Sequence, residues 1–393
     1  MRLVALGLAV LSTLGACTGA TPLPPAATSP PPREAGTIAV TALLDLSGGR
    51  APKGDAQRNA MQLWVDQQQA RGTTPRVRLR VVDLAGSDAR LLLELRHAGG
   101  SADADAIVIG VPVQLDDVLL GALALVGRPV LFTLPVTEPA GRGEGARWAF
   151  GLAPPPEAIA RLAVSALPAL TTPAVIVSDE SPLAVRERLA LQREFERQQR
   201  PAPTLIRATG SERDTVGQQL RPLLTIGAGI YFAGPATPYV APSRIVPVAD
   251  PNTSFASFLS YLTDGADAAQ LREAAPAARW PGTRTIVGPQ PLTGSGTARA
   301  EFVRAYGDRH GPPTTHAATA YDALAMLAYA ADRAGPDGDR LRDQIEGGTF
   351  AGIATTYSFA PARHAGADIG DLALLMWDSG RLALARPALM PSR

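Results

Sequence analysis

Short apolar segments alternate with longer amphipathic ones along the first third of the chain. The apolar segments predict strands, mostly buried on both faces of a sheet, at residues 37–44, 76–83, 106–110 and 129–134. Of these, 76–83 alternates arginine with apolar residues, which indicates a strand with one face in water. Apolar positions at helical spacing predict helices between the strands, at 54–70, 88–97 and 116–126. Because strands and helices alternate, the sequence predicts an α/β fold with a parallel, doubly wound sheet.

A second series of the same kind begins after the prolines at 154–156. Its predicted strands lie at 174–179, 204–208, 229–233 and 244–248, and its predicted helices at 159–170, 183–199 and 215–224. We expect the charged run over 186–200 to be a solvated helix face with i, i+4 ion pairs. The later chain predicts helices at 297–309, 315–334 and 339–346, and a hairpin between 352 and 384. Two α/β units therefore share one chain.

The first residues have the pattern of a secretory signal, with Arg2, an apolar run over 3–11 and small residues before Cys17. That run is shorter than the about 20 apolar residues that span a bilayer. Leu14-Gly15-Ala16-Cys17 resembles the lipobox of bacterial lipoproteins, in which the cysteine is lipidated and becomes the N-terminus. We expect a signal peptide over 1–16, and a lipidated Cys17 with a proline-rich tether over 17–35. The alternative is an ordinary signal peptide with a chance cysteine.

Composition excludes several classes of function. The chain has 37 basic and 36 acidic side chains in 393 residues, so it lacks the basic excess of nucleic-acid-binding proteins. Cys17 is the only cysteine, which leaves no intrachain disulfide and no cysteine-based metal site. No two histidines lie at i, i+3 or i+4, and no nucleophile elbow, phosphate loop or zinc-protease motif occurs. We expect no enzyme activity, no metal and no cofactor.

Several further segments stand in a specific order and spacing along the chain. The series starts with Ile38-Ala39-Val40, which leads into Leu46-Ser47-Gly48 and Gly54. It continues with the segments 106–110, 129–132, 137–139, 147–151, 231–234 and 320–324. In this order and spacing the segments resemble the type I periplasmic binding proteins, and the resemblance covers nearly all of residues 36–385. Its closest branch is the branched-chain amino acid and amide group of ABC-importer substrate-binding proteins, the leucine-binding proteins among them.

The resemblance implies two Rossmann-like lobes, each with a parallel doubly wound sheet, joined by a three-stranded hinge. We expect an N-terminal lobe of residues 36–151 plus 288–360 and a C-terminal lobe of residues 152–287 plus 365–390. The hinge crossings are expected near 150–153, 284–289 and 358–370. Members of the family close over a ligand like a hinge, so the ligand shifts a balance between open and closed forms.

Open α/β sheets bind ligands at the carboxyl ends of their strands, beside helix N-termini. The candidate ligand-binding residues lie in the loops that follow predicted strands: Ser47, Gln114, Thr137, Asp179, Thr237 and Asp250. The resemblance places Thr137 where the family has a carboxylate-binding threonine, and Asp179 or Asp250 could meet an ammonium group. Roles in turns or helix caps are the alternative for Ser47, Thr137 and the two aspartates.

Three departures from the family pattern bear on the ligand. Val111-Pro112-Val113-Gln114 replaces the family's serines, and a proline has no N–H for an anion. Pro182-Leu183 replaces an aromatic residue at the start of a helix. Only residues 235–243 separate the strand at 229–233 from the next predicted strand, so we expect a crossover helix to be missing from the second lobe.

The resemblance implies a monomeric receptor of an ABC importer, secreted across the inner membrane and lipid-anchored in the cell envelope. Such a receptor binds a small polar ligand, an amino acid or an amide-like molecule, and presents its closed form to a membrane permease. The alternative is a non-transport lipoprotein that uses a degenerate binding-protein fold as a sensory or protein-interaction module. The altered loop at 111–114 and the shortened second lobe favour that alternative.

Overall fold

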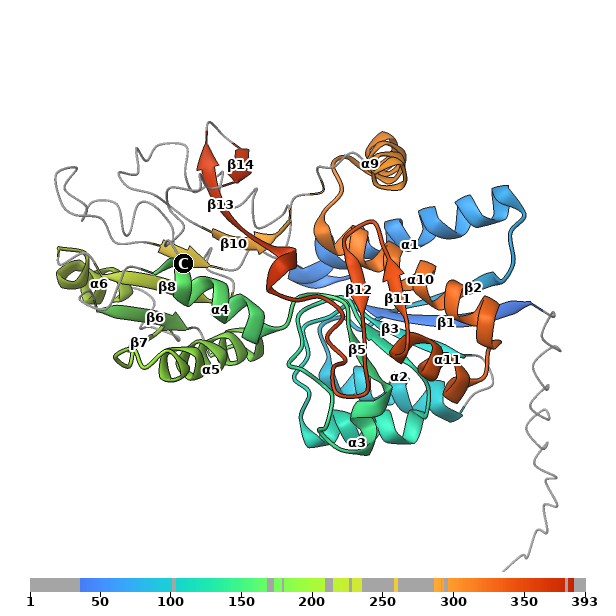
Figure 1. The fold of residues 1–393 in the computed structure, drawn as a ribbon, viewed down its shortest axis with the longest axis horizontal. Helices are drawn as coiled ribbons and strands as arrows, with labels where there is room; N and C mark the ends of the chain where they lie inside the picture. Colours follow the sequence, from blue (N-terminus) through green and yellow to red (C-terminus); the bar gives the residue numbers. More distant parts are fainter. Residues whose placement is uncertain are drawn as a thin grey trace, which may run out of the picture. The chain divides into compact units, whose positions relative to one another are not determined.

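The computed structural model describes residues 36–100, 104–167, 173–178, 180–208, 215–225, 228–234, 258–260, 286–290, 292, 296–378 and 381–384. All of these residues belong to one unit of the chain, Glu34–Arg393. Within the described residues, the strands form two parallel sheets and two small antiparallel ones (Figure 1).

The first sheet has five parallel strands in the order β2-β1-β3-β4-β5. These are β1 (Thr37–Leu44), β2 (Arg76–Asp83), β3 (Ala106–Ile109), β4 (Val130–Phe132) and β5 (Ala149–Gly151). Helices follow the first three strands: α1 (Ala51–Arg71), α2 (Asp88–Gly100) and α3 (Asp117–Val126). The alternation of strands and helices predicted from the first third of the sequence is therefore confirmed.

Local signals set the ends of these helices. α1 ends at Gly72, which has a φ of 64°, a left-handed conformation that glycine adopts without steric cost. At the start of α2, the N–H of Arg90 donates to Ser87 Oγ at 3.2 Å. At the start of α3, the N–H of Leu119 donates to the carboxylate of Asp116 at 2.9 Å. Both caps satisfy N–H groups that the first turn of a helix leaves without a partner.

Two hydrophobic cores pack against the first sheet, one on each face. The first core combines alternate residues of β1, such as Ile38 and Val40, with Met61 and Trp64 of α1 and Leu327 of α10 (Thr315–Ala334). The second core combines Leu43 of β1 with apolar side chains of α2 and α3. α10 lies beside α1 (Figure 1), so a helix from the last quarter of the chain covers the same face as the first helix.

The late segment contributes two more helices, α9 (Thr297–His310) and α11 (Gly338–Glu346), and a hairpin of β11 (Thr349–Ala351) and β12 (Thr356–Ser358). All three predicted late helices are confirmed. The sequence predicted one hairpin between 352 and 384, and the structure has two. The second hairpin joins β13 (Leu372–Asp378) to β14 (Arg381–Leu384) and pairs with β10 (Ile286–Pro289) in an antiparallel sheet.

Asp322 on α10 holds the turn of the first hairpin. Its carboxylate accepts the N–H of Ile353 at 2.7 Å, the N–H of Ala354 at 2.8 Å and the hydroxyl of Tyr357 at 3.0 Å. Burial raises the pKa of Asp322 to about 7, although all three hydrogen bonds act to lower it. A Cβ at Gly352 would overlap the Asp322 carboxylate, so the close approach needs glycine here.

The second sheet has four parallel strands in the order β7-β6-β8-β9. They are β6 (Ala174–Ser178), β7 (Thr204–Arg207), β8 (Gly229–Ala233) and β9 (Phe258–Ser260). Side chains of α4 (Pro156–Ala166) and α5 (Pro182–Arg197) share one core with this sheet, and α6 (Val216–Thr225) shares another. The second α/β unit predicted from the sequence is confirmed.

The strand beside β8 differs from the prediction. β8 pairs in parallel with β9, with Ile230 opposite Phe258, whereas the predicted strand at 244–248 lies outside the described residues. Parallel neighbours need a crossover of about a dozen residues or more. The connection from β8 to β9 is long enough for one. The expectation of a missing crossover helix rested on the short connection 235–243, between β8 and the predicted strand at 244–248. The observed parallel neighbour of β8 is β9, so that expectation does not apply to the pair β8 and β9.

Two predicted hinge crossings lie side by side. Gly151, at the end of β5, pairs in parallel with Ala365, and its N–H donates to the carbonyl of His364 at 2.8 Å. The third predicted crossing, 284–289, contains β10, which pairs with β13. The expected boundaries of the two lobes stay predictions.

Candidate functional site

The carboxyl ends of β1, β3 and β4 lie at one edge of the first sheet, because these parallel strands are neighbours. The loops that follow them are residues 45–47, 110–114 and 133–137. Open α/β sheets bind ligands at this edge. Ser47, Gln114 and Thr137 each lie in one of the three loops, so the sequence-predicted residues of this lobe fall at the same edge of the sheet.

Gln57 of α1 joins two of these loops. Its side chain is fully buried; Nε2 donates to the carbonyl of Gly110 at 2.9 Å, and Oε1 accepts the hydroxyl of Thr133 at 2.5 Å. A Cβ at Gly110 would overlap Gln57, so the loop after β3 can approach the helix only with glycine at this position. The sequence analysis missed Gln57. The available signal was its spacing from Ala60 and Trp64, which places it on the buried face of the helix.

The three predicted side chains differ in their surroundings. Ser47 is exposed and hydrogen-bonds the carboxylate of Asp83; the pKa of Asp83 is lowered chiefly by the main-chain N–H groups of Leu46 and Ala85, and further by this serine. Thr137 is half-buried, and its Oγ1 accepts a hydrogen bond from Arg142 Nη1 at 2.6 Å. Gln114 is exposed. The other three candidates, Asp179, Thr237 and Asp250, lie outside the described residues. All six stay predictions as ligand contacts.

A buried arginine connects the second sheet to this edge of the first. Arg186 lies in the second turn of α5, which follows β6, and is only 4% exposed. Its Nη1 donates to the carbonyl of Pro135 at 2.9 Å and also to the carbonyl of Val113. These carbonyls belong to the loops after β4 and β3. One side chain therefore spans from the carboxyl end of β6 to the carboxyl ends of two strands of the first sheet.

Burial lowers the pKa of Arg186 to about 10, while the carboxylates of Glu187 and Glu157 act in the opposite direction. A guanidinium with this pKa is protonated at neutral pH, so a positive charge lies at the candidate ligand-binding edge. Carbonyl dipoles and nearby carboxylates are what make such a charge tolerable in a buried place.

Glu187, the next residue, binds the carboxyl end of β8. Its Oε2 accepts the N–H of Gly234 at 3.0 Å and lies 3.3 Å from the hydroxyl of Tyr231. The expectation of a solvated face over 186–200 is therefore wrong for Arg186, Glu187 and Glu194, all of which are buried. It holds for Arg193 and Arg197, whose side chains are each 64% exposed.

The loop that carries Thr137 is also tied to a hinge crossing. Glu138 accepts main-chain N–H groups of His364 and Ala365. The buried His364 ring has Nδ1 2.9 Å from the carbonyl oxygen of Ala149 and Nε2 2.9 Å from Glu346 Oε1. The ring also stacks on Phe150, with 4.5 Å between ring centroids. A displacement of either crossing would therefore also move the loop that contains Thr137.

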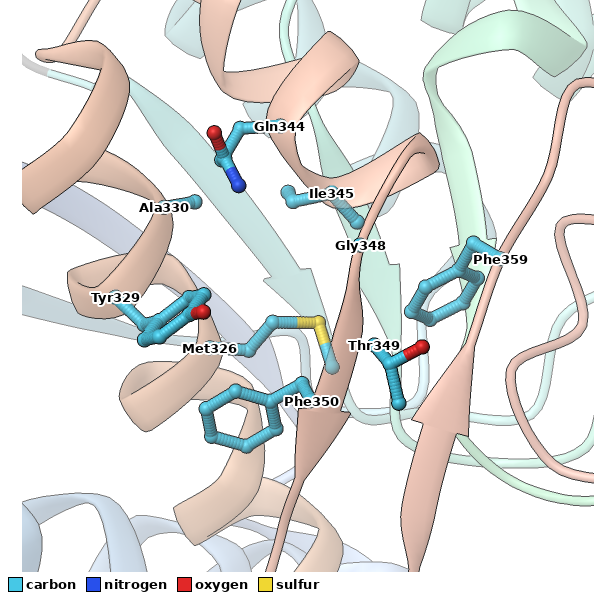
Figure 2. A pocket seen from close by; sticks show the side chains of 9 residues that line it. All are labelled: Met326, Tyr329, Ala330, Gln344, Ile345, Gly348, Thr349, Phe350 and Phe359. Atoms are coloured by element: carbon cyan, nitrogen blue, oxygen red, sulfur yellow. The ribbon is translucent and has the colours of Figure 1, made fainter.

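A small pocket lies elsewhere, between α10, α11 and β11 (Figure 2). It is lined by Met326, Tyr329, Ala330, Gln344, Ile345, Gly348, Thr349, Phe350 and Phe359. None of these residues belongs to the loops 45–47, 110–114 or 133–137. The volume of this pocket, including the part that is open to solvent, is about 240 Å³. Small-molecule sites are larger, at roughly 300–1,000 Å³. The carboxyl edge of the first sheet, with Arg186, is the stronger candidate.

Two further searches concern the part of the chain that the structure describes. In it, no group of three or more His, Cys, Asp or Glu side chains is arranged to hold a metal ion. None of its helices is both long and apolar enough to cross a membrane.

The site can be set beside known proteins. No family model matches the sequence, and no curated protein matches it. Among solved structures, a type 1 periplasmic binding protein from Bordetella pertussis Tohama I has a TM-score of 0.72 at 17% identity, over 90% of this chain and 100% of that chain. The branched-chain amino acid transporter substrate-binding protein LivJ of Streptococcus pneumoniae, in complex with isoleucine, has a TM-score of 0.67 at 18% identity, over 88% of this chain and 97% of that chain.

A solute-binding protein of an ABC transporter from R. palustris, in complex with benzoate, has a TM-score of 0.67 at 17% identity. It aligns over 89% of this chain and 95% of its own. In all three comparisons the similarity extends over nearly the whole of both chains, and at 17–18% identity it shows the architecture alone. The chain therefore has the fold of the type I periplasmic binding proteins, as its sequence predicted.

Proposed function

We propose that this chain is an extracytoplasmic solute-binding lipoprotein of an ABC importer, which binds a small polar ligand between its lobes and closes over it by hinge motion. The observation that carries the proposal is the contact of Arg186 with the carbonyls of Val113 and Pro135. It places the carboxyl ends of strands from two parallel sheets within reach of a single side chain. In α/β proteins this is where ligands bind.

An amino acid or an amide-like molecule is the proposed ligand class, with small carboxylates included. Two proteins of this fold were solved with isoleucine and with benzoate, and both ligands carry a carboxylate. A carboxylate suits the positive charge of Arg186 and the N–H groups at helix N-termini. Ser47, Gln114 and Thr137 would supply further polar contacts from the first lobe, and Asp179, Thr237 and Asp250 from the second.

The proposal extends to the location of the protein and its partners. Residues 1–16 would direct export, Cys17 would carry the lipid anchor, and 17–35 would tether a monomeric receptor to the membrane. The closed form would be presented to a membrane permease. The receptor would do no covalent chemistry, would need no cofactor or metal, and would bind no nucleic acid.

A second candidate function is a non-transport lipoprotein that uses the same fold as a sensory or protein-interaction module. The loop Val111-Pro112-Val113-Gln114 favours it. Where the family has serines, this chain has a proline without an N–H, and the carbonyl of Val113 is bound to Arg186. A loop engaged with its own protein in this way offers fewer groups to a solute.

Thermal unfolding against a panel of compounds distinguishes the two functions. The protein is first refolded from denaturant to remove any bound ligand, and is then heated with amino acids, amides and small carboxylates. A ligand at a hundred times its Kd should add about 2.7 kcal/mol to the free energy of unfolding and raise the Tm. Leucine against leucinamide, and benzoate against benzamide, are matched pairs that isolate the carboxylate. A rise with one chemical class supports the receptor, and no rise across the panel favours the interaction module.

A further inference from the structure

The start of α5 is anchored firmly to the second sheet. Ser181 caps the helix by accepting the N–H of Ala184 at 3.3 Å. Glu187 accepts the N–H of Gly234, directly after β8, at 3.0 Å. Arg186 lies between these two anchors and is therefore held by the frame of the second lobe before it makes any contact with the first.

The carbonyls that Arg186 binds are equally well held by the first lobe. Val113 and Pro135 are themselves buried, and the loops that contain them are joined by Gln57 through Gly110 and Thr133. Two charge-assisted hydrogen bonds thus run between two rigid supports. Hydrogen bonds that involve a charged group are roughly twice as strong as neutral ones.

We propose that Arg186 is a latch that holds the two lobes closed without any ligand. Its guanidinium contacts the loops after β3 and β4 and so bridges the two lobes. In a binding protein whose ligand-free form is open, a bound solute makes this bridge instead. The closed form is then a ground state of this chain rather than a form that a solute must induce. A solute would have to bind beside the latch or replace the carbonyl contacts that the guanidinium makes.

The two hydrogen bonds of Arg186 to the carbonyls of Val113 and Pro135 can form only when the lobes are together, so the latch stabilises the closed form. Breaking both hydrogen bonds by opening the lobes exposes the guanidinium to water, whereas removing the side chain leaves two buried carbonyls without this donor. Lobe separation would then be favoured, since water can reach those carbonyls only in an open form. The latch therefore predicts that the lobes of the wild-type chain stay closed and that the lobes of a variant without the guanidinium separate.

Pulsed electron spin resonance tests the latch directly, on protein that has been refolded from denaturant to remove any bound ligand and to which no ligand is added. Nitroxide labels are placed at Leu125→Cys on α3, where the native side chain is 78% exposed, and at Glu196→Cys on α5, also exposed, in the full chain carrying Cys17→Ser. The unlatched variant is Arg186→Met, and the matched control is Arg193→Met, which removes an exposed arginine from the same helix. Amide hydrogen exchange of residues 110–116 is measured alongside.

We expect a single narrow distance distribution for the wild-type chain and for Arg193→Met. Arg186→Met should shift to longer distances, broaden, and exchange faster over 110–116. A broad distribution in the wild-type chain, or equal distributions for wild type and Arg186→Met, overturns the latch. If Arg186→Met does not fold, Arg186→Gln is judged by the same criteria. Because no solute is present, either result is independent of whether the proposed receptor function is correct.

Discussion

Glu138 binds the main chain at His364: Glu138 Oε1 lies 2.7 Å from the N of His364, across more than half of the chain's length. The same oxygen accepts the N–H of Ala140 at 2.9 Å, and Oε2 accepts the N–H of Ala365 at 3.1 Å. One carboxylate therefore satisfies three main-chain donors where the crossing at Gly151 meets the crossing at Ala365. Glu138 belongs to the Thr137-Glu138-Pro139 segment, which gives that motif a structural role beside the predicted role of Thr137.

Glu138→Gln should destabilise the protein by about 1–3 kcal/mol, because the new amide nitrogen must face a main-chain N–H and leave a buried donor unsatisfied. The free energy of unfolding is measured from urea transitions. Glu144→Gln is the control, since the side chain of Glu144 is 70% exposed and pairs with Arg147 at the surface. Equal transition midpoints for the two variants would show that the carboxylate of Glu138 is not needed at the hinge.

Gly54→Ala should be strongly destabilising. Gly54 lies in the first turns of α1, and a Cβ there would overlap the carbonyl oxygen of Asp45, which is main chain and cannot rotate away. Overpacking of this kind costs about 1–3 kcal/mol and occasionally more. The matched variant is Gly121→Ala on α3, where a Cβ would have no atom within 4 Å. That variant should gain about 0.5–1 kcal/mol, because alanine favours a helix over glycine. Thermal unfolding of both checks the sign, and a stable Gly54→Ala protein would contradict the tight approach of α1 to the loop after β1.

Asp322 should make stability depend on pH. Its pKa is raised to about 7 in the folded protein from an ordinary value of 3.8, so the folded state holds a proton that the unfolded state releases. The contribution of Asp322 is therefore fully present below pH 3.8 and declines as the pH rises through about 7. Between the two pKa values the decline approaches about 1.4 kcal/mol per pH unit.

The measurement is the free energy of unfolding of the wild-type chain minus that of Asp322→Asn, from pH 5 to pH 8. This difference should fall as the pH rises to about 7 and then become level. Asp332→Asn, on the same helix with a side chain that is 57% exposed, is the control. A flat difference for Asp322→Asn would mean that Asp322 is ionised throughout this range in the folded state.

Cys17 should carry the membrane anchor. In bacterial cells, the wild-type chain should fractionate with membranes, and mass spectrometry should find an acylated cysteine at the N-terminus of the mature protein. Cys17→Ser should abolish acylation and move the protein out of the membrane fraction, because the lipid chains supply the attachment. Membrane association of Cys17→Ser equal to that of the wild type would contradict the lipobox and favour an ordinary signal peptide.

Most of the fold could be predicted from the sequence because its signals are local. The alternation of apolar strands with helical stripes, and caps such as Ser87 and Asp116, depend on residues close together in the chain. The strand β9 could not be predicted, because its pairing with β8 depends on a partner far away in sequence. The second hairpin has a local partner, because Asp378 of β13 lies opposite Arg381 of β14, and the sequence prediction merged it with the first hairpin into one.

The candidate site could be predicted only in outline. The carboxyl edge of the first sheet follows from strand order, so the loops of Ser47, Gln114 and Thr137 were found. Arg186 and Glu187 were missed, because charged residues in a helix are almost always exposed unless paired, and their partners come from other strands. Burial of a charge depends on the assembled fold, and no local sequence pattern in α5 predicts it.

The packing of α10 against α1 and β1 has a consequence for how the chain is made. Until residues 315–334 have emerged from the ribosome, the face of the first sheet that contains Ile38, Val40 and Leu44 has only part of its cover. Domains fold from the N-terminus during synthesis, and exposed apolar surface at that stage invites aggregation. This face of the nascent chain therefore stays partly uncovered until about four fifths of the chain has been made. A nonsense mutation anywhere before Thr315 would yield an aggregation-prone fragment that is readily degraded, rather than a smaller folded lobe.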